Sequence, residues 1–104
     1  LPPLLRSAKL QAHAARLGFD WPDVAGVLSK VREEIAELEA EIERADRPMV
    51  APPDSTAALE AIVARDANAG DGNASALAEE FGDLLFVLVR LAGHLGLSAE
   101  LCLE

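Results

Sequence analysis

The chain has 104 residues, of which 51% are apolar, and a formal net charge of −9. This length suits one domain with its own core, and the acidic balance excludes a sequence-independent nucleic-acid binder, which needs a basic surface; a small polyphosphate bridged by metal ions remains compatible. The single cysteine, Cys102, excludes an intrachain disulfide and favours a reducing, cytoplasmic compartment, and the apolar run 84–89 is far shorter than the roughly 20 residues that span a membrane.

The first predicted helix begins at one of the two prolines at positions 2 and 3 and ends near Leu17. Proline is tolerated there because the first N–H groups of a helix have no intrahelical partner. Gly18 ends this helix. Residues 19–23 predict a tight connection in which Asp20 or Asp23 caps the next helix.

The second predicted helix runs from about Val24 to Arg44. Its apolar residues recur at spacings of three and four, which indicates a helix rather than a strand. The predicted apolar seam consists of Val24, Leu28, Val31, Ile35, Leu38 and Ile42. Glu34 and Glu37 flank this seam, and Lys30 lies one turn before Glu34.

Residues 46–73 predict a flexible loop insertion, because they are rich in Pro, Ala, Asp, Gly and Asn. Prolines at positions 48, 52 and 53 rule out a continuous helix over the first part. A short helix is expected at 57–65.

The third predicted helix is capped by Asn73 or Ser75, continues to Leu95 and ends at Gly96. Ser98 then caps a fourth helix, of which 99–104 is expected to be only the beginning, so that the domain at 1–104 is truncated at its C-terminal end. The third helix is apolar over most of its circumference, which predicts a central position or a subunit contact. We therefore expect an all-α antiparallel helical bundle that forms a homodimer or a higher homo-oligomer.

Glu80 is the most informative residue, because it places a carboxylate in the apolar stripe of the third helix. At about 100° per residue, Glu80 points into this stripe, whereas Glu79 lies on the polar side. Its neighbours in the stripe are Leu77, Leu84, Val87 and Leu91. An ionised carboxylate there costs several kcal/mol unless a cation or a hydrogen-bond donor compensates it. A metal ion and a structural pair with an Arg or Lys both satisfy this requirement.

Packing of the second helix against the third brings two pairs of carboxylates together. Glu34 and Glu37 are three residues apart, as are Glu80 and Asp83. Hard cations such as Mg²⁺ or Mn²⁺ prefer such oxygen ligands, whereas Zn²⁺ fits poorly without nearby histidines and cysteines. The non-functional interpretation of the second helix, taken alone, is a solvated acidic face with a Lys30–Glu34 ion pair.

Several motifs also occur in a characteristic order. They are Gly18-Phe19-Asp20-Trp21, Lys30, Glu33-Glu34-x-x-Glu37, Glu80-x-x-Asp83 within the string EEFGDLLF, and His94-Leu95-Gly96. In this order they resemble the MazG nucleoside triphosphate pyrophosphohydrolases, and most closely the C-terminal MazG domain of the two-domain bacterial proteins. The resemblance covers nearly the whole chain.

The resemblance implies an all-α enzyme that hydrolyses a nucleoside triphosphate to the monophosphate and pyrophosphate with Mg²⁺, for which Mn²⁺ is a possible substitute. It implies that the metal ligands are Glu34, Glu37, Glu80 and Asp83, and that Glu33 and Glu34 are catalytic, with Glu33 as a further ligand or a water-orienting base. Lys30 would contact a phosphate or stay paired with Glu34. Trp21 would stack on the base or close the core.

Other interpretations remain open. One is a narrower-substrate relative, a dUTP or phosphoribosyl-ATP pyrophosphohydrolase, and another is a non-catalytic helical dimerisation or regulatory module. The insertion at 46–73 is longer than expected for the family, which predicts a lid, a subunit contact or a tolerated insertion. Arg90 stands where members of the family often have a smaller polar residue, and it is expected to add a salt bridge or alter the interface. His94 is predicted on the polar side of its helix.

Overall fold

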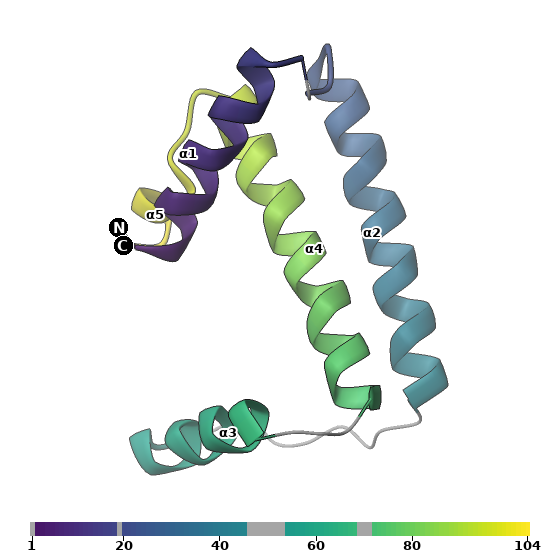
Figure 1. The fold of residues 1–104 in the computed structure, drawn as a ribbon, viewed down its shortest axis with the longest axis vertical. Helices are drawn as coiled ribbons and strands as arrows, with labels where there is room; N and C mark the ends of the chain where they lie inside the picture. The colour runs from purple at the N-terminus through teal and green to yellow at the C-terminus, as the bar shows by residue number, and fades with distance from the viewer. Residues whose placement is uncertain (1, 19, 46–53, 69–71) are drawn as a thin grey trace.

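The computed structural model describes residues 2–18, 20–45, 54–68 and 72–104. These residues form the helices α1 (Pro3–Arg16), α2 (Val24–Ala45), α3 (Thr56–Asn68), α4 (Gly72–His94) and α5 (Ala99–Cys102), and no strand occurs among them (Figure 1). The predicted all-α class is confirmed. Within the described residues, no helix has the length and apolarity needed to cross a membrane.

Most predicted helix ends are confirmed by their backbone and side-chain contacts. Gly18 follows α1 with a φ of 91°, a conformation that glycine adopts without strain. The Asp23 carboxylate accepts a hydrogen bond from the Gly26 N–H at 2.8 Å, and the Ser98 hydroxyl accepts one from the Leu101 N–H at 3.3 Å. Both residues therefore cap the helices that follow them.

The predicted start of α4 was wrong. This helix begins at Gly72, so Asn73 and Ser75 lie inside it rather than capping it. A capping side chain contributes only about 1 kcal/mol, which does not prevent a helix from starting further upstream where no proline intervenes.

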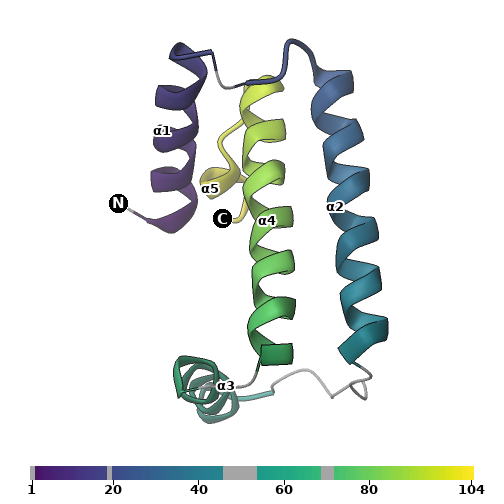
Figure 2. The ribbon, with the colours of Figure 1, turned by 45° about the vertical axis from the view of Figure 1, so that its right-hand side comes forward.

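Helices α2 and α4 lie side by side and antiparallel, and α1 and α5 pack on the other side of α4 (Figures 1 and 2). The core between α2 and α4 contains Val27, Val31 and Val87. Half-buried Trp21, Leu84 and Leu91 pack against it. Helices α1 and α5 also contact each other (Figure 2). The stripe of α4 that contains Glu80 therefore faces α2, as the helical period predicts.

The predicted seam of α2 was only partly correct. Val31 is buried, but Leu28, Ile35 and Ile42 are 36%, 41% and 49% exposed. The buried positions of α2 are instead Val27, Val31, Glu34 and Glu41. Helix α2 has apolar residues on two adjacent faces, so spacing alone did not decide which of them meets α4. The second face forms an outer stripe of Leu28, Ile35 and Ile42.

Helix α3 is not packed extensively against another described helix (Figure 1). It begins after Ser55, whose hydroxyl accepts a hydrogen bond from the Ala58 N–H at 3.1 Å. Its apolar residues Leu59 and Val63 are exposed. The short helix expected at 57–65 is confirmed and is longer at both ends, while 46–53 and 69–71 of the predicted flexible loop lie outside the described residues.

Asp20 does not cap α2 but links the α1–α2 connection to α4. Its carboxylate accepts a hydrogen bond from Arg90 Nε at 2.9 Å and a second from Arg90 Nη2, and His94 Nε2 lies 3.3 Å from Asp20 Oδ1. The salt bridge expected of Arg90 is confirmed, whereas His94 is half-buried rather than on a polar surface. The Arg90 hydrogen bond is the main cause that lowers the pKa of Asp20 from 3.8 to about 2.

Replacement of Arg90 by Met is expected to lower the free energy of unfolding at pH 7 by about 1–2 kcal/mol. Because the pKa of Asp20 is depressed in the folded state, its contribution is present above about pH 4 and is lost as the pH falls towards 2. Urea unfolding at several pH values should therefore show the difference between wild type and Arg90→Met shrinking in acid. Arg16→Met, at an exposed position of α1, is the control. A difference that does not change with pH would contradict this account.

Candidate metal centre

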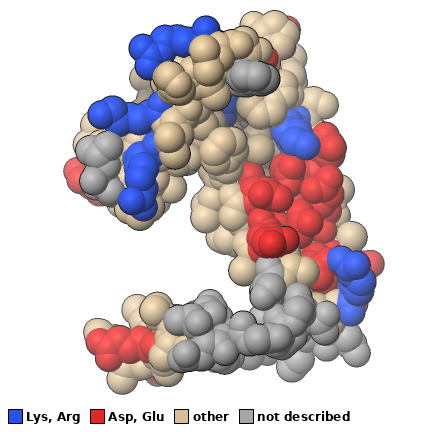
Figure 3. All heavy atoms as spheres, in the orientation of Figure 1, with Lys and Arg blue, Asp and Glu red and all other residues tan. Residues whose placement is uncertain are grey.

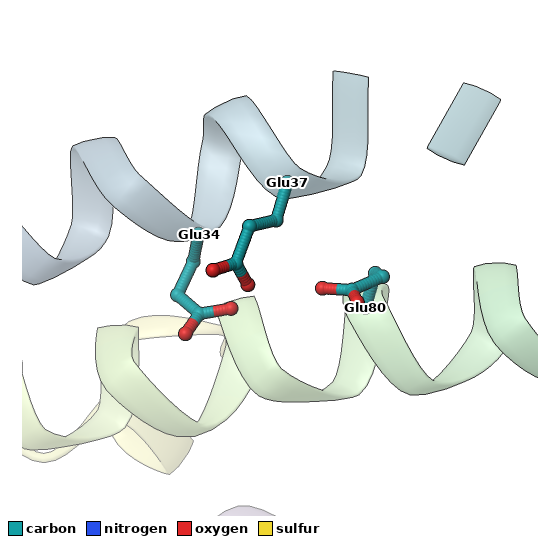
Figure 4. A group of neighbouring side chains, drawn as sticks. All are labelled: Glu34, Glu37 and Glu80. Atoms are coloured by element: carbon teal, nitrogen blue, oxygen red, sulfur yellow. The ribbon is translucent and has the colours of Figure 1, made fainter. Parts of the chain in front are cut away.

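Three glutamate side chains converge between α2 and α4. Glu34 and Glu37 come from α2 and Glu80 comes from α4, and one carboxylate oxygen from each lies within 4.8 Å of the others (Figure 4). A spacing of three residues places both α2 carboxylates on the side that faces α4. The structure thus brings together three of the four predicted metal ligands.

The three carboxylates differ in exposure. Glu34 is only 5% exposed, Glu80 is half-buried and Glu37 is exposed. Glu34 Oε2 and Glu80 Oε2 are buried without a hydrogen-bond partner. An unpartnered buried carboxylate oxygen is costly, so each of these two atoms requires a cation or a hydrogen-bond donor as a partner.

The charges of the group act on one another. The pKa of Glu37 is raised, chiefly by the charge of Glu34, with further contributions from partial desolvation and from Glu80. A divalent cation held between these carboxylates would remove the repulsion. The donor set consists only of carboxylate oxygens, which fits Mg²⁺ or Mn²⁺.

Lys30 lies beside this group. Its Nζ is 3.2 Å from Glu34 Oε1 and 3.4 Å from Glu33 Oε1, and the first of these hydrogen bonds is the main cause that raises the pKa of Lys30. Lys30 therefore compensates one oxygen of Glu34, while Glu80 Oε2 keeps no partner. Glu33 itself is exposed at the edge of the group.

Asp83 and Trp21 lie outside the three-carboxylate group. Asp83 is exposed on α4, one turn after Glu80, and is not among the grouped ligands. Trp21 is half-buried against the Val27–Val31–Val87 core and also lines a cavity of about 140 Å³. The other residues that line this cavity are Leu10, Gln11, Ala14, Phe86 and Arg90. Trp21 thus closes the core and borders a cavity at the same time.

Glu41 is a buried carboxylate that the sequence reasoning missed. It is 3% exposed and forms an ion pair with Arg44, one turn further along α2. Its position four residues after Glu37 and seven after Glu34 was the available signal, because that spacing places all three on one helix face. Acidic side chains consequently gather over α2 and the adjoining part of α4 (Figure 3).

The fold and this group define an all-α domain with an acidic, metal-type centre between two antiparallel helices. All 104 residues align with the nucleoside triphosphate pyrophosphohydrolase of Escherichia coli K12 at 38% identity. They align at 32% identity with the nucleoside triphosphate pyrophosphohydrolase/pyrophosphatase MazG of Thermotoga maritima. The resemblance to the MazG nucleoside triphosphate pyrophosphohydrolases is therefore confirmed over the whole chain.

The chain spans only 30% and 29% of the length of these two relatives. No family model and no solved structure matches it significantly. The activity of these longer relatives is therefore only proposed for this chain.

Proposed function

We propose that this chain is the catalytic domain of a Mg²⁺-dependent nucleoside triphosphate pyrophosphohydrolase, which yields the monophosphate and pyrophosphate. The observation that carries the proposal is the group of Glu34, Glu37 and Glu80, with two buried carboxylate oxygens that lack partners. Identity of 38% to a nucleoside triphosphate pyrophosphohydrolase supports the substrate class. A purely structural bundle gains nothing from burying these unpaired charges.

In this proposal Glu34, Glu37 and Glu80 hold the metal, and Asp83 reaches it from the next turn of α4. The bound ion would neutralise the triphosphate and lower the pKa of a coordinated water. Exposed Glu33, at the edge of the group, would orient a water molecule and accept its proton as the water attacks the α-phosphorus. The α–β phosphoanhydride bond would break, and pyrophosphate would leave. Glu34 serves both as ligand and as a member of this catalytic pair.

Two residues are proposed to hold the nucleotide. Lys30 contacts a phosphate oxygen, since its ammonium already lies beside the carboxylates. Trp21 contacts the base from the cavity that it lines with Phe86 and Arg90. Phe86 follows Glu80 by six residues on α4, about 9 Å further along the helix and about 120° around it, on the flank that faces α1.

We also propose that two copies of the chain associate through one apolar face. Glu34 of α2 and Glu80 of α4 face each other. The next residue on each helix, Ile35 or Phe81, is rotated by about 100° around its own helix axis from that contact. Because α2 and α4 are antiparallel, equal rotations about the two helix axes place Ile35 and Phe81 on the same side of the helix pair. The face therefore combines the outer stripe with Phe81, Leu85 and Leu88, all of them at least 36% exposed in the single chain. Such a contiguous apolar surface is typical of a protein–protein contact.

Product analysis tests the proposed activity directly. The domain, within its full-length protein, is incubated with each nucleoside triphosphate with and without Mg²⁺, and the products are separated by ion exchange. We expect monophosphate and pyrophosphate only when Mg²⁺ is present. Diphosphate and orthophosphate would contradict the assigned bond cleavage, turnover of dUTP or phosphoribosyl-ATP alone would indicate a narrower substrate, and no product would favour a non-catalytic module.

A further inference from the structure

Lys30 shares a carboxylate with the proposed metal. It binds Glu34 through Oε1, and the other oxygen of the same carboxylate, Oε2, is buried without a partner. Glu34 is also one of the three grouped carboxylates. A divalent ion at Oε2 and the Lys30 ammonium at Oε1 would be two cations on one carboxylate. They repel each other at such short range, most strongly where water is excluded.

The charge balance shows what Lys30 does in the absence of metal. Three carboxylates form the group, and Lys30 is the cation that lies against it, divided between Glu34 and Glu33. One shared positive charge offsets part of the repulsion that raises the pKa of Glu37 but does not cancel it. The group therefore keeps an attraction for divalent ions, reduced by the ammonium already present.

The Lys30 side chain can also exchange partners. It is 32% exposed, and a flexible four-carbon stem lets an ammonium exchange partners without a backbone change. Lys30 precedes Glu34 by four residues, and Glu37 follows it by three, so both are rotated to the same side of α2, opposite the outer stripe. Asp83 follows Glu80 by three residues, as Glu37 follows Glu34, and α4 is antiparallel to α2, so Asp83 lies on that side of the helix pair too. A triphosphate that reaches the carboxylates from there meets Lys30 at once.

We propose that Lys30 is an internal counter-ion that weakens binding of free metal and passes from Glu34 to a phosphate oxygen when a metal–nucleotide complex arrives. This inference rests on the proposed function. It makes Lys30 a residue that selects for metal already carried by the substrate. The chain thereby avoids holding a divalent ion tightly when no nucleotide is present.

The test removes the charge and measures two affinities. Lys30→Gln and Lys30→Met are titrated with Mn²⁺ alone by calorimetry, and their KM for the Mg²⁺–nucleotide complex is measured separately. We expect Mn²⁺ to bind about threefold to tenfold tighter in both variants. The KM should change in the opposite direction and rise about tenfold, because a charge-assisted contact to phosphate is lost.

Arg32→Gln is the matched control, because it removes the same charge from an exposed position on α2. Both affinities should stay within about twofold of wild type there. Unchanged or weaker Mn²⁺ binding in the Lys30 variants would overturn the inference and leave Lys30 as an ordinary helix ion pair. Wild type that binds no Mn²⁺ and cleaves no nucleotide would instead overturn the proposed function, so the two failures are distinguishable.

Discussion

Substitution of Glu80 by Gln is expected to reduce turnover by about 100-fold or more while leaving the helices intact. The amide has nearly the shape of the carboxylate but carries no charge and is a poor ligand. Glu80 Oε2 is buried without a partner, and its side chain faces Glu34 and Glu37 (Figure 4). The measurements are kcat with the preferred nucleotide and helix content by circular dichroism.

Glu79→Gln is the matched control, since Glu79 is the preceding residue of α4 and is exposed. Its kcat should remain within about twofold of wild type. The two variants should also differ without substrate. Wild type and Glu79→Gln should melt at higher temperature in millimolar Mg²⁺, because the proposed metal ion would bind only the folded state, and Glu80→Gln should lose that increase. Equal behaviour of the two variants would show that the facing of α4 does not determine function.

Substitution of Ile35 by Lys is expected to convert the proposed dimer into a monomer. Ile35 lies at the centre of the apolar face and is 41% exposed in the single chain. An ammonium at the centre of a helix-on-helix contact must lose its hydration without gaining a partner, which costs several kcal/mol in each copy. Light scattering after size exclusion should therefore give half the wild-type mass.

Leu17→Lys is the control for that experiment. Leu17 is 63% exposed at the end of α1, away from the α2–α4 apolar face, so the variant should keep the mass of wild type. A monomeric wild type, or an Ile35→Lys protein that stays dimeric, would show that the apolar face meets something other than a second copy.

The positions of the helices could be predicted from local chemistry. Prolines, glycines and short capping side chains act on their immediate neighbours, so Gly18, Asp23 and Ser98 identified helix ends correctly. The start of α4 was misjudged, because several residues there are compatible with a cap and none of them enforces one. Local sequence signals therefore predicted which segments are helical more accurately than they predicted the first residue of each helix.

The facing of the helices was predictable for α4 but not for α2. In α4 the apolar stripe around Glu80 is dominated by large residues, and Val87 is indeed buried. In α2 the preference for burying Ile35 over Glu34 was natural, yet the structure buries Glu34 and leaves Ile35 at the surface. Burial of a carboxylate opposes the usual ranking of side chains, so hydrophobicity alone cannot predict it.

The candidate site shows the same limits. Glu34, Glu37 and Glu80 were predicted to meet because a three-residue spacing on each of two packed helices suffices. The Asp20–Arg90 contact joins residues 70 positions apart, and neither side chain indicates its partner in the sequence. Long-range polar pairs of this kind depend on the final placement of the elements, which a single sequence does not contain.

The placement of α3 has a consequence for chain entropy. Glu37 and Glu80 belong to helices on either side of α3, and α3 itself is not packed extensively against either of them. A cation held by both carboxylates closes a loop of about 40 residues, as a cross-link would. The entropic cost of closing a loop rises only with the logarithm of its length, so doubling the number of residues adds about 0.6 kcal/mol. The connecting segment can therefore lengthen or shorten at little thermodynamic cost, while the helices that carry the carboxylates keep their register.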